Sequence, residues 1–302
     1  MGPEIREKDG SLESDSRWFR SPSSSFPLNG KETRLVYSLD VPDITKLVEN
    51  PGRGFRLRLG EKQGFWMSTS YGYKPMNSLA LKYKSRLFLP EKDPNTGQVT
   101  MQPAVLYHEV MGTDFGYQND GFEFSLSYLH DKPYPKTAEE GWVMQSPEGL
   151  SANAAHFSFE SKDLLPNGLL QSWSWLSDIE LALDYLQVSG GRIHDFDSAG
   201  QESGAIFEER LNFTNAAQVQ VIKSLWLLGK PMKGQVKYLR EFAQKGSLWG
   251  MELQFYPKPK WALVMGADVL GVDDDRNENT DSRFLNQFRA NDRYYAGLSY
   301  VF

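Results

Sequence analysis

Residues 247–270 read SLWGMELQFYPKPKWALVMGADVL, and the order of apolar and polar residues in this stretch decides the fold. On both sides of Pro257-Lys258-Pro259-Lys260, large apolar residues occupy every second position, and small or polar residues fill the positions between them. Successive side chains of a strand point to opposite faces, so a period of two predicts strands with one apolar and one polar face. The proline-rich tetrapeptide predicts a tight turn, and the stretch is therefore predicted to form an antiparallel hairpin.

The same alternation recurs from about residue 34 to the end of the chain. A second short turn is expected at Lys74-Pro75-Met76-Asn77. The pattern predicts an all-β meander of antiparallel hairpins. Fourteen candidate strands follow from it, at 34–41, 52–60, 64–74, 78–89, 99–111, 121–130, 151–160, 175–188, 204–213, 216–227, 234–243, 247–256, 259–270 and 293–302.

The composition excludes several classes of protein. The 302 residues carry 33 basic and 39 acidic side chains, a net charge of −6, and no basic cluster of the kind that binds nucleic acid. There is no cysteine, which excludes a disulfide scaffold and thiolate metal sites. No apolar run approaches the ~18 residues that a membrane helix needs.

Three features favour a transmembrane antiparallel meander β-barrel over a soluble sandwich or propeller. Aromatic residues lie near the ends of the apolar rows, as Phe65, Tyr73, Trp249, Phe255 and Trp261 do, where a barrel carries its interfacial girdles. The polar rows hold several charges per strand, which suits a wet lumen. Many candidate strands reach the ~9–11 residues of a tilted membrane strand, whereas soluble strands average about five or six.

The C-terminus supplies a more specific signal. The chain ends in Tyr295-Ala296-Gly297-Leu298-Ser299-Tyr300-Val301-Phe302. This segment resembles the terminal strand of Gram-negative outer-membrane β-barrel proteins, whose assembly signal has a polar or aromatic residue, a Gly two positions later, and hydrophobic residues in the last and third-from-last places. Tyr295, Gly297, Tyr300 and Phe302 fill those places. The resemblance implies a bacterial outer-membrane location and recognition by the barrel-assembly machinery.

The side of the membrane on which each long connection would lie tests the predicted number of strands. Bacterial single-chain barrels have an even number of strands, short periplasmic turns and longer external loops. With a periplasmic C-terminus, fourteen strands place the long connection 272–292 outside but 189–203 and 131–149 on the periplasmic side. Two regions are suspect: 204–243, where Glu209, Lys223 and Arg240 would face lipid, and 34–41, which Pro42 follows. Removing one strand from each gives twelve, so twelve or fourteen strands are predicted.

The first 33 residues differ from the rest. Residues 1–33 are rich in Ser, Glu, Asp, Arg and Pro, and we expect a poorly ordered leader or a plug-like segment ahead of a barrel at 34–302. The opening MGPEIREKDG has no apolar signal-peptide core, so the sequence is either that of a cytoplasmic protein or a mature sequence with a start codon added, and the C-terminal segment favours the second.

The inward-pointing charges are unevenly distributed along the chain. A basic set comes from the early strands, and an acidic set comes from the middle and late strands. In a barrel these sets would form opposed walls and leave a transverse field across the water-filled lumen. The alternative is a closed lumen in which they pair with one another. The predicted pore-lining residues are Arg56, Arg58, Lys82, Lys84, Arg86, Glu160, Asp178, Glu180, Asp184, Glu208, Glu252 and Asp268.

Two motifs have a spacing that is typical of catalytic or metal-binding sites. His156-Phe157-Ser158 has the His-x-Ser spacing of outer-membrane lipid hydrolases. Phe157 and Phe159 are expected to face lipid, however, so the alternation places His156 and Ser158 on the inward face. Asp273, Asp275 and Asn277 begin a calcium-loop spacing that fails at Glu278, where glycine is required. No catalytic residue, metal site or cofactor is predicted.

The most economical function is a porin-like outer-membrane channel for small polar or charged solutes. Outer-membrane lipids and lipopolysaccharide are the other expected partners, and nucleic acid is not one. A second hypothesis is a structural or adhesive barrel with a closed lumen, whose long loops bind a partner or lipopolysaccharide. A third is an outer-membrane lipid hydrolase that uses His156 and Ser158.

Overall fold

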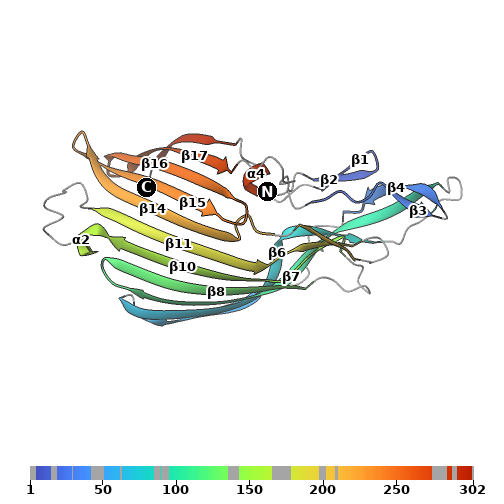
Figure 1. The fold of residues 1–302 in the computed structure, drawn as a ribbon, viewed down its shortest axis with the longest axis horizontal. Coiled ribbons are helices and arrows are strands. Elements are labelled where there is room, and N and C mark those ends of the chain that lie inside the picture. Colours follow the sequence, from blue (N-terminus) through green and yellow to red (C-terminus); the bar gives the residue numbers. More distant parts are fainter. Residues whose placement is uncertain are drawn as a thin grey trace.

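The protein is all-β. The computed structural model describes residues 5–14, 19–28, 30–41, 51–61, 63–84, 89, 95–134, 143–164, 178–196, 202–207, 210–273, 284–287 and 291–300. These ranges contain eighteen strands and two four-residue helices, α2 (Ser161–Leu164) and α4 (Phe284–Gln287) (Figure 1). Neither helix has the length or apolar character to cross a membrane.

The main sheet is a long antiparallel meander. Within the described ranges it has thirteen strands. Eleven of them pair antiparallel with their neighbours in the meander, and the β3–β4 hairpin joins the sheet through a parallel pairing of β4 with β7. The eleven strands of this meander are β5 (Arg53–Gly60), β6 (Gly64–Tyr83), β7 (Thr96–Gln118), β8 (Phe122–Tyr134), β10 (Leu150–Glu160), β11 (Ile179–Gly190), β14 (Asn215–Leu227), β15 (Lys230–Glu241), β16 (Gly246–Lys258), β17 (Trp261–Val272) and β18 (Arg293–Tyr300).

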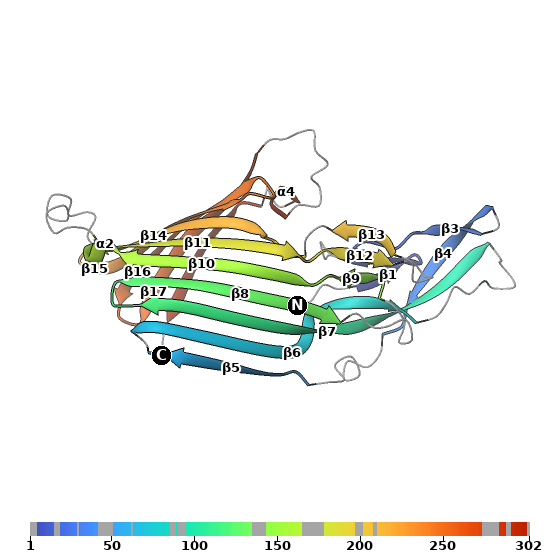
Figure 2. The same ribbon diagram turned by 60° about the horizontal axis from the view of Figure 1, so that its bottom comes forward.

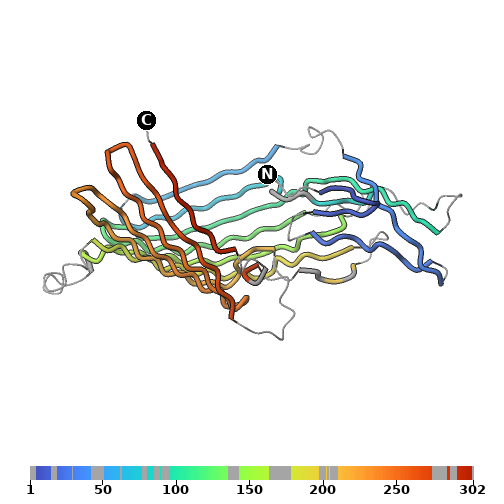
Figure 3. Tube along the Cα trace, turned by 90° about the horizontal axis from the view of Figure 1, so that it is seen from above, coloured from blue at the N-terminus to red at the C-terminus, as the bar shows by residue number. Residues whose placement is uncertain are grey.

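The meander is strongly curled. Figures 2 and 3 show β15–β18 running at a steep angle to β8–β11, so that the sheet wraps around an interior. Strands β5 and β18 form its two edges, and no pairing joins them within the described ranges. A closed barrel of twelve or fourteen strands is therefore not confirmed by the described residues, although the antiparallel meander is.

All three predicted long connections lie at the same end of the sheet, which we call the loop end. Residues 131–149 join β8 to β10, 189–203 lie between β11 and β14, and 272–292 join β17 to β18. The parity conflict disappears because 204–213 is not a strand of the meander. Its ordered part, β13 (Glu202–Phe207), pairs instead with β12 (Ile193–Phe196), and β12 pairs with β9 (Gln145–Pro147).

The turn expected at Lys74-Pro75-Met76-Asn77 is wrong. Strand β6 passes through it without reversing, and its register against β7 shifts between Pro75 and Leu79. Proline has no N–H to donate, so it is found at turns or at bulges, and Pro75 lies at a bulge. Beyond it, β6 and β7 extend together past the loop end.

The N-terminal residues belong to this extension. Strands β1 (Ile5–Lys8) and β2 (Ser11–Ser14) form one hairpin, and β3 (Ser25–Leu28) and β4 (Lys31–Leu39) form another across the expected boundary at residue 34. Strand β4 then pairs parallel with β7. This pairing keeps 34–41 out of the meander, as suspected from Pro42. The extension lies beyond the curled sheet in Figures 1 and 2.

The extension has its own small core, in which Leu12, Leu35, Leu81, Val99 and Met101 are buried. Tyr37 completes it: the ring is 4% exposed, and the hydroxyl donates a 2.8 Å hydrogen bond to the Ser23 carbonyl. The described part of residues 1–33 is therefore folded against the strand ends, and does not fill the space enclosed by the meander.

Alkaline pH should loosen this core. Burial, with a smaller effect of the Asp195 charge, raises the pKa of Tyr37 from 10.0 to about 12. A pKa raised on folding adds stability that is complete below pH 10.0 and is lost as the pH rises through about 12. After correction for base-catalysed intrinsic exchange, the protection of the Val99 and Met101 amides should fall across this window, and Tyr37→Phe should abolish that fall. An unchanged profile in Tyr37→Phe would contradict the assignment.

Candidate functional site

The two faces of the meander differ in chemistry. On the outward face, cross-strand partners form apolar rows, for example Phe65, Tyr117, Phe124, Phe157, Leu183, Val219, Tyr238, Trp249 and Val269. Many of these large side chains are exposed, including Phe65 at 67% and Met251 at 52%. Soluble monomers rarely expose apolar patches of more than a few hundred Å². A contiguous apolar face of this kind is suited to hydrocarbon.

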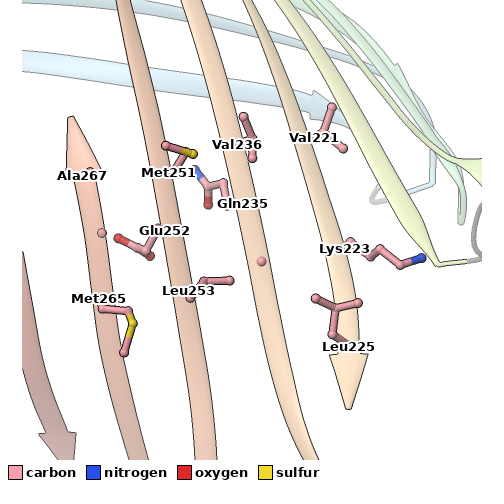
Figure 4. Close-up of a pocket in the computed structure, with 12 residues that line it drawn as sticks. Val221, Lys223, Leu225, Gln235, Val236, Met251, Glu252, Leu253, Met265 and Ala267 are labelled. Carbon is pink, nitrogen blue, oxygen red and sulfur yellow. The ribbon is translucent and has the colours of Figure 1, made fainter. Parts of the chain in front are cut away.

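A hollow of about 530 Å³ interrupts this face over β14–β17 (Figure 4). It arises where Gly234 presents no side chain, and Val221, Leu225, Leu253 and Met265 are among its apolar walls. Lys223 lies at its edge and extends toward the neighbouring strand (Figure 4). Of the charges expected on this face, Lys223 therefore remains there. Arg240 lies at the loop end and forms an ion pair with Asp273 at 2.5 Å.

Aromatic residues border the apolar face at both ends. At the loop end, the hydroxyls of Tyr71 and Tyr134 both donate to Glu109, at 3.0 and 2.5 Å. At the opposite end, the rings of Trp261 and Tyr300 contact at 4.9 Å between centroids. Such belts are typical of membrane–water interfaces, because these side chains pair an apolar body with a polar tip.

The inward face is polar and more sheltered. Ser68, Ala182 and Ile222 are exposed by 1%, 8% and 9%, whereas their outward neighbours Met67 and Leu183 are exposed by 45% and 39%. This difference is expected where the sheet is curled with its polar rows on the concave side.

Arg56 and Arg58 lie on this inward face, as predicted from the alternation. The Arg56 Nε donates to Ser68 Oγ at 3.0 Å, and its guanidinium lies 3.8 Å from Asp114. Arg58 stacks over the Trp66 ring at 4.8 Å. The basic group is thus held at one edge of the sheet by contacts to β6 and β7.

Lys82 and Lys84 lie elsewhere. Both follow the β6 bulge, where the strand leaves the meander, and Lys84 forms an ion pair with Asp40 in the extension. They do not join the row of Arg56 and Arg58. Lys82 and Lys84 were predicted to line the pore because a turn was expected at residues 74–77. Strand β6 instead continues through a bulge at this point and carries both lysines into the extension. Arg86 and Glu208 lie outside the described residues, as does Glu209.

The predicted acidic residues fall mainly on the inward face. Glu160 and Glu180 are direct cross-strand partners, and Lys162 pairs with Glu160 at 2.6 Å. Glu252 accepts a 2.8 Å hydrogen bond from the Tyr295 hydroxyl. Asp268 pairs with Arg293 and lies 3.8 Å from Lys237. Asp178 sits outside the rows, at a turn residue with φ of 60° just before β11.

The residues of the C-terminal signal divide between the faces. Tyr295 and Gly297 are inward, since Tyr295 reaches Glu252, and Tyr300 is outward beside Trp261. Phe302 lies outside the described residues. Their role as an assembly signal stays a prediction.

A hydrogen-bonded group on three neighbouring strands was not foreseen as a unit. His156 Nδ1 and Asp184 Oδ1 are 2.7 Å apart, and Gln218 Nε2 donates to Asp184 Oδ2 at 3.1 Å. The register of β10, β11 and β14 places the three side chains directly opposite one another. Within the described ranges no hydrogen bond joins Ser158 to His156. Asp184 therefore orients the His156 imidazole, but the imidazole is not hydrogen-bonded to Ser158, the candidate nucleophile.

A second unforeseen group holds the connection that precedes β14. Arg210 donates to Asp131 at 2.6 Å, and His108 Nδ1 lies 2.8 Å from the same carboxylate. All three side chains are 10–13% exposed. The connection enters the concave side of the sheet at this point, because Asp131 belongs to the inward row of β8.

No protein-family model matches the chain, and no curated protein matches it. Two solved structures resemble it at a TM-score of 0.28: a KdgM porin, at 9% identity, and a KdgM porin in complex with disordered oligogalacturonate, at 8%. Each likeness covers 83% of this chain and 92% of the other. A TM-score of 0.28 is too low to establish a shared fold.

Proposed function

We propose that this protein is an outer-membrane β-barrel of Gram-negative type that passes small polar or charged solutes through its lumen. One observation carries the proposal: a curled antiparallel sheet exposes apolar rows on its convex face and holds charges on its concave face. In water this arrangement would expose the apolar face at high cost, whereas in a bilayer the apolar face meets lipid.

The lumen is expected to be charged unevenly. Arg56 and Arg58 lie on the edge strand β5, and Arg293 lies on the other edge strand, β18. The inward rows of β8, β10 and β11 hold Glu123, Asp131, Glu160, Glu180 and Asp184. If the edges come together, the arginines face the acidic strands across the lumen. Such opposed walls orient dipolar solutes and bias ion selectivity.

Planar-bilayer recording tests the proposal. The full chain should conduct ions, and Arg56→Glu/Arg58→Glu should shift the reversal potential in a salt gradient toward cation selectivity, because a positive wall becomes negative. Lys84→Glu reverses one positive charge in the extension and should leave the reversal potential unchanged. If correctly inserted protein gives no ion current, the proposed channel function is wrong.

The extension supports the second hypothesis, a barrel whose loop end binds a partner. Strands β1–β4 and the sheet β9-β12-β13 enlarge the loop end far beyond the length of a simple loop. Lipopolysaccharide, which lies in the outer leaflet, is one such partner. Binding of lipopolysaccharide by a protein that gives no ion current in a planar bilayer would favour this function over the channel. A lipid hydrolase finds no such support, because His156 and Ser158 face inward.

A further inference from the structure

The segment from Arg210 to Thr214 lies against the concave face and is held on two sides. On one side, Arg210 pairs with Asp131 of β8 at 2.6 Å. On the other, the Asn212 carbonyl accepts a 2.5 Å hydrogen bond from Gln244. The fully buried Glu241 accepts from the backbone N–H groups of Thr214 and Asn215, at 3.3 and 3.0 Å. These contacts fix the segment over the intervening strands.

A cavity of about 230 Å³ lies beside this segment. Phe213 forms one wall, and the inward faces of β8, β10, β11 and β14 form the floor. Small and apolar side chains line part of it, namely Ala154, Leu186, Ala216 and Leu239. Drug-sized ligands occupy pockets of ~300–1,000 Å³, so this volume suits a single small ring.

The polar part of the lining is built for hydrogen bonding. Asp184 accepts from Gln218 and holds the Nδ1 side of His156, which leaves Nε2 as the second hydrogen-bonding atom of the imidazole. The hydroxyls of Ser125 and Ser127 also line the cavity, and each can donate and accept. The cavity thus pairs an apolar floor with convergent donors and acceptors.

The charge around the cavity restricts what enters it. The inward rows of β8, β10, β11 and β14, as far as the structure describes them, contain five carboxylates and no lysine or arginine: Glu123, Asp131, Glu160, Glu180 and Asp184. Arg210 is paired with Asp131 and Lys162 with Glu160, so neither offsets Asp184. An anion in the cavity would lie beside the Asp184 carboxylate, whose partners are the His156 imidazole and the Gln218 amide, and would be repelled by it, whereas a neutral or cationic group would not.

We propose that this cavity is a solute-binding subsite in the channel, which takes one hydroxyl-rich ring, uncharged or bearing an amine, and rejects the corresponding acid. The inference rests on the proposed function and names the class of solute. The ring's C–H face packs on Phe213 and the alanines, and its hydroxyls bind His156, Asp184 and Gln218.

Three sugars that differ at one substituent test the subsite. Glucose and glucosamine should interrupt the ion current through the full-length channel, and the concentration of glucuronate for half-block should be at least about tenfold higher. Asp184→Asn should weaken glucosamine block by about tenfold, the scale of a hydrogen bond to a charged group. Equal block by all three sugars would overturn the charge argument.

A matched pair of amide variants locates the site. Gln218→Leu should weaken block by glucose and glucosamine, whereas Gln254→Leu removes an inward amide on β16, outside the cavity lining, and should leave block unchanged. A conducting channel in which Gln218→Leu behaves as wild type would overturn the subsite and leave the channel intact.

Calorimetry on the full chain in detergent gives a readout that does not need conduction. Glucosamine should bind the wild type and Gln254→Leu, and bind Gln218→Leu at least about fivefold more weakly. Binding without conductance would refute the channel and retain the site. Absence of binding in the wild type would refute the site.

Discussion

Met251→Arg should lower the free energy of unfolding in phospholipid vesicles by about 2–4 kcal/mol, the cost of a cation near the bilayer midplane. Met251 is 52% exposed in the middle of the apolar rows, between Trp249 and Leu253. Its cross-strand partners Val236 and Ala267 are apolar and cannot solvate a guanidinium, so the cost arises from hydrocarbon and should shrink in detergent micelles. Denaturant unfolding in the two environments measures it.

Gln235→Arg is the matched control. Gln235 lies on the neighbouring strand β15, on the inward face, directly opposite Glu252. A cation there meets a carboxylate and water, and we expect a change of less than about 1 kcal/mol. Equal costs for the two variants would show that the outward face does not contact lipid.

Arg210→Ala should destabilise the loop end by about 3–5 kcal/mol. The change leaves Asp131, whose side chain is 13% exposed, without its guanidinium partner. The segment carrying Phe213 should also lose its anchor on β8, so single-channel conductance should rise as the segment leaves the lumen. Denaturant unfolding and planar-bilayer recording measure the two effects.

The double variant Arg210→Ala/Asp131→Ala separates charge from packing. Removing the carboxylate, which among the described residues His108 alone then contacts, should restore much of the lost stability, because the penalty of a single change is mainly that of the remaining buried charge. Conductance should stay high, since the anchor is still missing. A double variant as unstable as Arg210→Ala would assign the cost to packing instead.

Local alternation was sufficient to predict the strands and their faces in most of the chain. Trp249, Met251 and Leu253 point outward and Glu252 inward because a period of two is fixed by strand geometry alone. Where proline interrupts the pattern, sequence is ambiguous. Pro259 lies in a real turn between β16 and β17, whereas Pro75 lies in a bulge, and this difference moved Lys82 and Lys84 out of the predicted lumen.

The interior groups could not be derived in the same way. Parity already placed His156 and Asp184 inward, but their contact depends on the register between β10 and β11, which the pattern leaves open. Arg210 meets Asp131 across 79 residues, through a connection whose path no periodicity describes. The inward Glu123, Lys237 and Arg293 were within reach of the alternation rule and were missed.

The direction of the two edge strands limits how this sheet could close into a barrel. Each step along the eleven-strand meander reverses direction, so β5 and β18 run the same way. Direct contact between them would give slanted, parallel hydrogen bonding, and an antiparallel seal needs one additional strand between them. Within the described residues neither edge pairs with a further strand, so a β-segment placed between them could pair antiparallel with both.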